Sequence, residues 1–397
     1  MTSLPPRDQA APHILPDDPS TDRADSTGIA HRAVSTVNAN RRRFIGGVLA
    51  IGAMLGLYPI RTISAQQATP VTDAVDDYVW TPPAYDPEPA LFTIMDRTEE
   101  EITVETIDGL ITIPAHPQRV VSLGWEYVAL FELGLAERLV GVGYRPPELS
   151  RAGDLTDDLH AALEHVELLF IDELDLEQIV LLKPDLILAS PLWTEDISAL
   201  SEIAPTIRGL TSATDVPRAA VRDFGALFDR ESVAVDLIAE HDAFIERAKQ
   251  TLAPAIVGKK AITVYPYEQN LYAYPSYYLA NGGVFALAYG PYQLHRELGI
   301  TPSSFVERIA DEDERQHVAV EVSVERMNEI DADYLFVNGT QQEVDAFVAN
   351  TPTVALTVAG QNNQLYPYDS LEVGFGLPSV RAAVALIVEQ ITGEPFA

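Results

Sequence analysis

The sequence predicts an α/β protein of two similar lobes, on the evidence of its length, a repeated unit and the order of its apolar runs. The chain has 397 residues, which is more than one hydrophobic core usually serves. Its 47% hydrophobic residues are enough to fill two cores. We expect a central, mostly parallel sheet in each lobe, one long helix bridging the lobes, and a ligand cleft between them.

One stretch of the chain occurs twice. Leu176–Leu188 reads LEQIVLLKPDLIL and Val324–Phe336 reads VERMNEIDADYLF. In each copy an acidic residue opens a short apolar run with helical spacing, a break follows, and a β-rich run comes next. The aligned positions are Glu177 with Glu325, Ile179 with Met327, Leu182 with Ile330, and Asp185 with Asp333. Two copies of a helix–strand unit, one in each half, indicate two lobes.

Composition excludes several function classes. The 59 acidic and 26 basic residues give a formal net charge of -33, which disfavours nucleic acid and anionic lipid as partners. The chain has no cysteine, so disulfides, thiol nucleophiles and a lipid anchor on cysteine are excluded. The eight histidines are scattered, with His160 and His165 at the wrong helical offset, and we expect no metal site. No catalytic motif occurs, so we expect no enzyme activity.

The beginning of the chain, residues 1–65, predicts an export signal behind a long leader. Residues 1–40 are rich in Pro, Asp, Ser and Thr, which predicts disorder. The basic residues Arg41, Arg42 and Arg43 precede the apolar stretch VLAIGAMLGLYPI and a small-residue ending at Ala65. This form predicts a twin-arginine-type signal peptide cleaved after Ala65. The alternative is an uncleaved membrane anchor, for which a stretch interrupted by Gly and Pro is short.

A second disordered segment, residues 66–90, is predicted as a linker rich in Thr, Pro, Asp and Gln. The N-terminal lobe, 91–215, then opens with a hairpin. Two alternating strands, Glu101–Ile107 and Leu110–Ile113, flank a turn at Asp108 and Gly109.

Short apolar strands alternate with helical segments in the rest of this lobe, which predicts a parallel sheet. The strands are Val120–Leu123, Leu139–Val142 and Leu186–Ala189, and a helix over Trp125–Leu133 ends at Gly134. Ligands of such sheets bind beyond the carboxyl ends of the strands. The residues at these ends include Trp125, Tyr144, Arg145 and Trp193.

A long helical pattern covers residues 216–253, and Gly225 and the turn Asp229–Glu231 are places where it could bend. We interpret it as one bridging helix. The C-terminal lobe, 254–397, begins with the strand Ala261–Val264, whose exit is rich in tyrosine. It continues through the second copy of the repeat and closes on a helix over Pro378–Ile391.

Five stretches carry a resemblance to a known family. In chain order they read QRVVSLGWEYVALFELGLAERLVGVG, DLEQIVLLKPDLILAS, KKAITVY, LHRELGI and VSVERMNEIDADYLFV. Together they resemble the periplasmic binding proteins of iron-siderophore and cobalamin uptake over most of Leu110–Thr392. The resemblance implies two Rossmann-like lobes with a cleft between them and delivery of the ligand to an ABC transporter permease. From the export signal we expect the protein in the periplasm or on the extracellular face of the cytoplasmic membrane, and we expect a monomer.

In that family one glutamate on each lobe pairs with arginines of the permease, and the matching positions are Glu177 and Glu325. An acid in the first turn of a helix is also stabilised by the helix dipole, by about 0.3–1 kcal/mol. Each glutamate taken alone therefore has a purely structural interpretation. Its recurrence in both lobes favours docking.

The ligand that the resemblance implies is an iron-siderophore complex, whose iron is already saturated, so we expect no cofactor of the protein's own. Aromatic rings and an arginine suit such a complex, although packing at lobe edges is an alternative role for the rings. The family often has an arginine at the position of Tyr265, so the tyrosine argues against a strongly anionic ligand. The candidate ligand-binding residues are Trp125, Tyr144, Arg145, Trp193, Tyr265, Tyr267, Tyr278 and Phe375.

Two function classes stay open. The first is an exported solute-binding protein for an iron-siderophore, with cobalamin or haem as alternative ligands of the same fold. The second is a secreted enzyme or sensor ectodomain on the same two-lobe scaffold. The lack of a catalytic motif and the repeated glutamate favour the first class.

Overall fold

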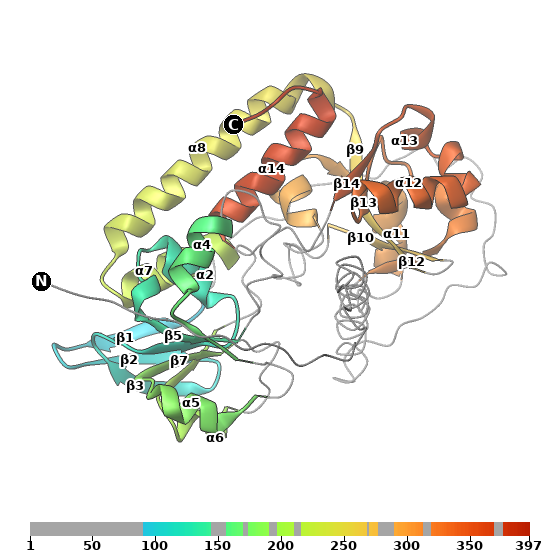
Figure 1. The fold of residues 1–397 in the computed structure, drawn as a ribbon. Helices are drawn as coiled ribbons and strands as arrows, with labels where there is room; N and C mark the ends of the chain where they lie inside the picture. Colours follow the sequence, from blue (N-terminus) through green and yellow to red (C-terminus); the bar gives the residue numbers. More distant parts are fainter. Residues whose placement is uncertain are drawn as a thin grey trace, which may run out of the picture. The chain divides into compact units, whose positions relative to one another are not determined.

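The computed structural model describes residues 90–143, 156–169, 174–189, 197–209, 216–267, 270–276, 290–312, 319–368 and 376–397. These residues all fall within one unit, Tyr58–Ala397, and form three sheets with their covering helices (Figure 1). The predicted export signal and linker lie outside the described residues. The lobe boundaries given above stay predictions.

The hairpin sheet contains the two expected strands and one more. Its bounds are β1 (Thr93–Arg97), β2 (Glu101–Thr106) and β3 (Gly109–Pro114), all antiparallel. Gly109 turns the chain with a φ of 107°, a conformation that favours glycine. Ile102 and Val104 of β2 are fully buried, so the hairpin packs onto the N-terminal core.

The sheet of the N-terminal lobe is parallel throughout, as the sequence predicts. Its strand order is β6-β5-β4-β7-β8, and the central strands β4 and β7 are buried along their whole length. The strands are β4 (Val120–Ser122), β5 (Leu139–Val142), β6 (Glu167–Leu168), β7 (Leu186–Ala189) and β8 (Thr206–Arg208).

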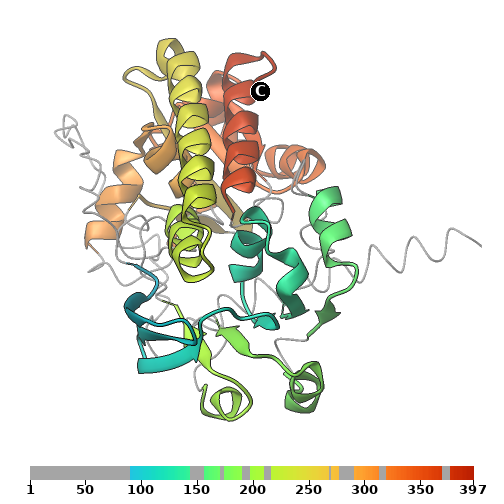
Figure 2. The ribbon, with the colours of Figure 1, turned by 90° about the vertical axis from the view of Figure 1, so that its left-hand side faces the viewer.

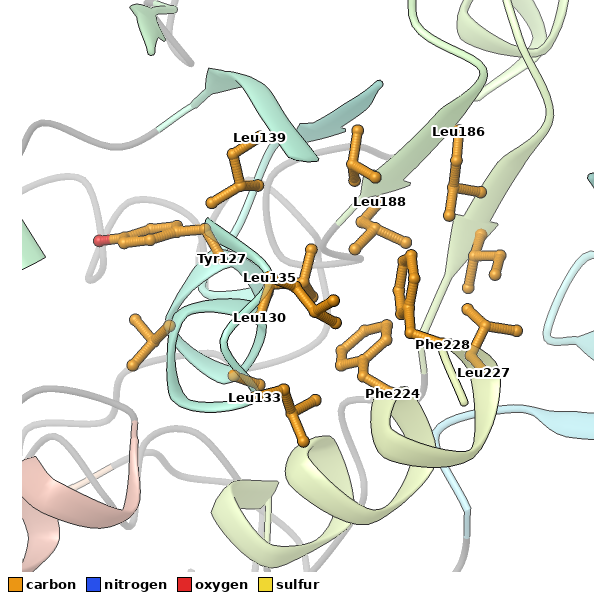
Figure 3. Packing of buried hydrophobic residues seen from close by; sticks show 14 of the residues in the cluster. Tyr127, Leu130, Leu133, Leu135, Leu139, Leu186, Leu188, Phe224, Leu227 and Phe228 are labelled. Atoms are coloured by element: carbon orange, nitrogen blue, oxygen red, sulfur yellow. The ribbon is translucent and has the colours of Figure 1, made fainter. Parts of the chain in front are cut away.

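Helices cover both faces of this sheet. Leu186 and Leu188 of β7 face one core, where Phe224 and Phe228 pack against them (Figure 3). Ile187 of β7 faces a second core, closed by α5 and α6. The helical segments before the bridge are α2 (Glu126–Glu132), η2 (Ala136–Arg138), α4 (Thr156–Leu163), α5 (Leu176–Leu182) and α6 (Ser198–Ser201).

One long helix bridges the lobes, but it covers only part of the predicted segment 216–253, which folds as two helices, α7 (Val216–Leu227) and α8 (Glu231–Ile256). The break is at Asp229, whose φ is 57°. Arg97 of β1 donates hydrogen bonds of 2.6 Å to the Ala226 carbonyl and 2.7 Å to Asp229, which caps the end of α7. A Cβ at Gly225 would lie 2.7 Å from the Cβ of Ala234, so glycine lets the two helices approach closely.

The long helix α8 forms the bridge. Ala234 near its start belongs to the N-terminal core, whereas Ile245, Ala248 and Leu252 belong to the C-terminal core. The helix also continues through Pro254, beyond the predicted end.

The sheet of the C-terminal lobe is mixed. Its order is β12-β10-β9-β13-β14, with β11 also paired to β9. The pairs of β9 with β13 and β11, and of β13 with β14, are parallel, whereas β10 is antiparallel to both of its neighbours. The strands are β9 (Lys260–Tyr267), β10 (Asn270–Tyr274), β11 (Thr301–Pro302), β12 (Val320–Ser323), β13 (Tyr334–Asn338) and β14 (Leu365–Tyr368).

The helices of this lobe also cover both faces of their sheet. One face packs on α8, η4 and α14, and α8 and α14 lie side by side in Figures 1 and 2. The other face packs on the remaining helices. The segments are η4 (a π-helix, Tyr292–Glu297), α11 (Ser304–Glu312), η5 (Val324–Glu329), α12 (Gln341–Asn350), η6 (Pro352–Leu356), α13 (Val358–Gln361) and α14 (Leu377–Thr392).

The second copy of the repeat contains a 3₁₀-helix, η5, where the sequence predicts an α-helix. Arg326 pairs with Glu329 through two hydrogen bonds of 2.7 and 2.8 Å. Residues three apart eclipse each other in a 3₁₀-helix, so this ion pair favours the tighter winding.

Candidate functional site

Tyrosines gather at the carboxyl end of β9. Tyr265 and Tyr267 share a face of the strand and stack with ring centroids 6.3 Å apart. Tyr272 of β10 is the cross-strand partner of Tyr265, and its ring lies 6.4 Å from that of Tyr267. Tyr265 and Tyr272 are half-buried against the C-terminal core, and Tyr267 is 39% exposed. The cluster therefore offers aromatic surface at a strand exit, and the sequence analysis named two of its three tyrosines, Tyr265 and Tyr267, as ligand contacts.

Trp125 lies at the carboxyl end of β4 in the other lobe. It is the partly exposed residue that precedes α2, and the turn around it is fixed by Ser122, whose hydroxyl accepts a hydrogen bond of 3.1 Å from the backbone of Tyr127. The same hydroxyl contacts Glu126 at 3.2 Å. Burial raises the pKa of Glu126, and hydrogen bonds to the carboxylate oppose this only in part. The sequence analysis missed this acid, although it directly follows Trp125 at a strand exit.

The other predicted ligand contacts cannot be compared with the fold. Tyr144, Arg145, Trp193, Tyr278 and Phe375 lie outside the described residues. They stay predictions, as do Arg41, Arg42, Arg43 and Ala65 for the export signal.

Glu177 and Glu325 occupy equivalent places on the two lobes. Each is the second residue of its helix and is exposed, and the capping side chain before it is Asp175 in one lobe and Ser323 in the other. Neither glutamate carboxylate has a hydrogen-bond or ion-pair partner among the residues described here. Two such carboxylates can each bind an external guanidinium group.

A buried ionic network joins α7, α8 and η4. Arg218 donates to Glu297 at 2.6 and 3.2 Å, and His241 Nε2 lies 3.3 Å from the same carboxylate. Burial alone would raise the pKa of Glu297, but the hydrogen bonds with His241 and Arg218 and the positive charge of Arg218 outweigh it, so the pKa lies below its usual range. Arg218 also binds Asp242 at 2.7 Å. The network ties the end of the N-terminal lobe to the C-terminal lobe.

The sequence analysis assigned no role to this network, although Glu297 belongs to the LHRELGI stretch. His295 of the same stretch is fully buried, and its Nδ1 lies 2.7 Å from the Ile300 carbonyl. Burial lowers the pKa of His295 to about 4 against the effect of that hydrogen bond. The imidazole is therefore neutral and structural at physiological pH.

A second buried acid, Glu132 of α2, meets the first turn of α14. Burial raises the pKa of Glu132 to about 8, and the charge of Arg381 and a hydrogen bond with the backbone of Leu377 counteract this in part. A Cβ at Gly376 would overlap the Glu132 carboxylate and Val128, so this contact requires glycine before α14. The start of α14 thus lies against a buried acid of the N-terminal lobe.

Two further features bear on the class of protein. Within the described segments, no three His, Asp or Glu side chains converge in a way that could hold a metal ion. No helix within those segments has the length and apolar content needed to cross a membrane.

Residues 120–371 match the family described as "Periplasmic binding protein". The chain belongs to this family. The matched region contains both copies of the repeat, the tyrosine cluster and both exposed glutamates. The two-lobe fold described above is the fold of this family. Members of the family face the periplasm or the cell exterior.

The curated relatives of this periplasmic binding protein are themselves binding proteins rather than enzymes. The iron(3+)-hydroxamate-binding protein FhuD of Bacillus subtilis is 23% identical over 296 residues, which are 74% of this chain and 87% of that protein.

Solved structures share the fold. The petrobactin-binding protein YclQ of Bacillus subtilis has a TM-score of 0.57 at 22% identity, over 74% of this chain and all (100%) of that one. Staphylococcus aureus SirA complexed with staphyloferrin B has a TM-score of 0.56 at 21% identity, over 72% of this chain and 97% of that one.

Proposed function

We propose that this chain is an extracytoplasmic solute-binding protein that captures an iron-siderophore complex and delivers it to the permease of an ABC transporter. The observation that carries the proposal is the family match over residues 120–371, together with relatives named for iron(3+)-hydroxamate and petrobactin. The iron is part of the cargo and is coordinated by the siderophore. The binding site therefore needs a shape complementary to the complex and aromatic side chains, rather than metal ligands of its own.

The tyrosine cluster supports the binding step. Tyr265, Tyr267 and Tyr272 present ring faces and phenolic hydroxyl groups at the end of β9, and such groups suit a bulky chelate with apolar and polar parts. Trp125, at the corresponding strand exit of the other lobe, is the matching aromatic residue there. The remaining proposed contacts are Tyr144, Arg145, Trp193, Tyr278 and Phe375.

The two exposed glutamates support the delivery step. Because the ligand-facing aromatics lie at strand exits and Glu177 and Glu325 lie at helix starts, binding and docking use different residues. We further propose that the chain is exported by the twin-arginine-type signal around Arg41–Arg43, cleaved after Ala65, and that it acts as a monomer.

Fluorescence quenching tests the proposed ligand class. The panel is ferrioxamine B, a ferric catecholate, a ferric citrate-type siderophore, haem and cobalamin, titrated into the full chain. We expect saturable quenching by at least one ferric siderophore, because Trp125 and the tyrosine cluster face the ligand. The same siderophore without iron should bind more weakly, since its shape is not fixed.

If haem or cobalamin binds more tightly than every ferric siderophore, the protein belongs to another ligand class of the same fold. Silence across the panel together with turnover of a substrate would contradict the binding function itself.

A further inference from the structure

A half-buried carboxylate, that of Glu321, continues the tyrosine cluster across the sheet of the C-terminal lobe. Tyr272 of β10 is paired with Tyr265 of β9 on one side and with Glu321 of β12 on the other. Directly opposed residues of neighbouring strands point to the same face of a sheet. Tyr265, Tyr272 and Glu321 therefore form one row across three strands, and the acid lies on the outermost strand of the described order.

A second row lies one step nearer to the exit of β9, and it carries Tyr267 of β9 opposite Asn270 of β10. Side chains two residues apart on a strand share a face, so this row lies beside the first. The ring contacts of Tyr267 with Tyr265 and with Tyr272 agree with this arrangement. The side-chain amide of Asn270 donates a hydrogen bond to Glu321 and joins the two rows at their polar end. We call these five residues the tyrosine–glutamate face.

The carboxylate of Glu321 is partly desolvated without a cation to balance it among the residues that the structure describes. Its hydrogen-bond partner there, the Asn270 amide, is neutral. Burial raises the pKa of Glu321, the hydrogen bond with Asn270 opposes this in part, and no positive charge of a described residue contributes to the shift. Because the local dielectric constant is lower than that of water, this carboxylate attracts a cation more strongly than a fully solvated one does.

The tyrosine rings attract the same kind of group. The face of an aromatic ring carries partial negative charge, and a cation within about 6 Å of the ring centroid is stabilised by it. Three such rings beside one carboxylate suit an ammonium group on an apolar stem, because the stem can pack on the rings while the charge reaches the acid. A neutral group would leave the carboxylate without an ion-pair partner, and an anionic group would be repelled by it.

We propose that the ligand is a ferric siderophore with a pendant ammonium group, and that Glu321 selects it by pairing with that group. The inference rests on the proposed function and adds the charge class of the siderophore. The rings of Tyr265, Tyr267 and Tyr272 contact the chelate and its alkyl arm, and Asn270 holds the carboxylate in place.

The first experiment compares three forms of one chelate on the full chain: ferrioxamine B, its N-acetyl derivative and its N-succinyl derivative. The ferric trihydroxamate core is neutral, so the pendant group alone makes these complexes cationic, neutral and anionic. Fluorescence quenching measures the three dissociation constants. We expect ferrioxamine B to bind at least about fivefold more tightly than the N-acetyl form, and the N-succinyl form to bind most weakly. Equal affinities, or tightest binding of the N-succinyl form, would overturn the proposal.

The second experiment tests Glu321 itself. Glu321→Gln keeps the size and the hydrogen-bonding capacity of the side chain but removes its charge, so the preference for ferrioxamine B over the N-acetyl form should fall below about twofold. Glu321→Lys should reverse the order and make the N-succinyl form bind most tightly, which a purely structural role of this residue would not produce. Thermal unfolding checks that both variants fold, and if neither does, the comparison on the unmodified chain still decides.

Glu389→Gln is the matched control. Glu389 is another half-buried, hydrogen-bonded glutamate of the same lobe: it lies on α14 and accepts a hydrogen bond of 2.8 Å from the backbone of Phe396. The substitution removes the same charge from the chain, so it measures the effect of net charge alone. It should leave the preference for ferrioxamine B as it is in the unmodified chain, and an equal loss in both variants would contradict a specific role of Glu321.

The outcomes separate this inference from the proposed function. Absence of binding by every ferric siderophore would refute the proposed function. Binding of ferric siderophores without a preference for the ammonium form, binding only of siderophores that lack an amine, or a preference that survives Glu321→Gln would each refute the charge selection and leave the proposed function standing.

Discussion

In the N-terminal lobe, Asp185 accepts hydrogen bonds of 2.8 and 2.9 Å from the backbone N–H groups of Gln118 and Arg119. In the C-terminal lobe, Asp333 accepts one of 2.9 Å from the backbone of Lys260. Each aspartate also donates its own N–H to the neighbouring strand, to Arg119 at 2.9 Å and to Lys260 at 2.8 Å. The repeated aspartate thus ties the starts of two parallel strands together in both lobes.

The two copies of the repeat share these aspartate hydrogen bonds but differ in their helices. The first copy is an α-helix that ends at Lys183 in the left-handed conformation, and the second is a 3₁₀-helix that ends at the extended residue Ile330. Around the glutamates, the first copy presents the exposed side chains of Leu176, Val180 and Leu181, whereas the second borders a pocket of about 510 Å³ lined by η5, α12, η6 and the end of β9. Both copies of the repeat therefore keep the aspartate that joins two strands and one exposed glutamate at the same position. The residues around that glutamate differ between the copies.

The largest expected effect is on docking. Glu325→Ala should lower permease affinity at least about tenfold and more than Glu177→Ala does, because a guanidinium group at Glu325 would lie in a lined pocket and be better shielded from water than one on the exposed surface of α5. The double variant should not deliver ligand, and siderophore affinity should stay unchanged in all three. Glu164→Ala, at an exposed site on the N-terminal lobe, is the control. Equal losses of permease affinity in the two single variants would show that the two copies do not differ in docking.

An intermediate effect is expected at the clamps. Asp185→Ala and Asp333→Ala should each lower the free energy of unfolding by about 2 kcal/mol, because each leaves charge-assisted hydrogen bonds unmade. Asp333 also binds Lys259 Nζ at 2.7 Å, and this lysine is 47% exposed. The loss at Asp333 should therefore shrink in high salt, whereas the loss at Asp185 should not. Denaturant unfolding at two salt concentrations measures both, and identical salt dependence would contradict the assignment.

The smallest effect is expected at the helix caps. Asp175 accepts from the backbone of Glu177 at 2.9 Å and of Gln178 at 3.3 Å, whereas Ser323 accepts only from that of Glu325, at 3.4 Å. Asp175→Ala should cost about 1 kcal/mol of stability, and Ser323→Ala clearly less. Hydrogen exchange of the first helical turns checks the order of the two effects. A larger loss from Ser323→Ala would mean that the cap does not distinguish the copies.

Much of the fold follows from local patterns. The strand Leu186–Ala189 has the predicted bounds, and the helix before Gly134 and the hairpin at Gly109 are also where the sequence places them. These elements are short apolar runs between glycine, proline or charged residues, so neighbouring residues alone define them. The break between α7 and α8 is different, because Arg97, more than a hundred residues earlier in the chain, caps the end of α7.

Local sequence patterns likewise reveal only some residues of the candidate site. Glu177 and Glu325 could be found because the repeat marks them, and Tyr265 and Tyr267 because they follow the apolar run Ala261–Val264, although β9 continues through both. Tyr272 joins that pair only through the antiparallel pairing of β10 with β9, which a tyrosine-rich exit does not reveal.

By itself the sequence determined the two α/β lobes, the repeated unit and the exposed carboxylate of each copy, since hydrophobic period and helix-start chemistry are local. Tertiary structure alone decided the Glu297 network, the burial of the acid Glu132 and the pocket beside Glu325. Each of these is assembled from segments far apart in the chain: α7 with η4, α2 with α14, and β9 with η5 and α12. The pKa shifts of Glu297 and Glu132 arise from burial and pairing, and the pocket arises from packing. All of these exist only once the chain has folded.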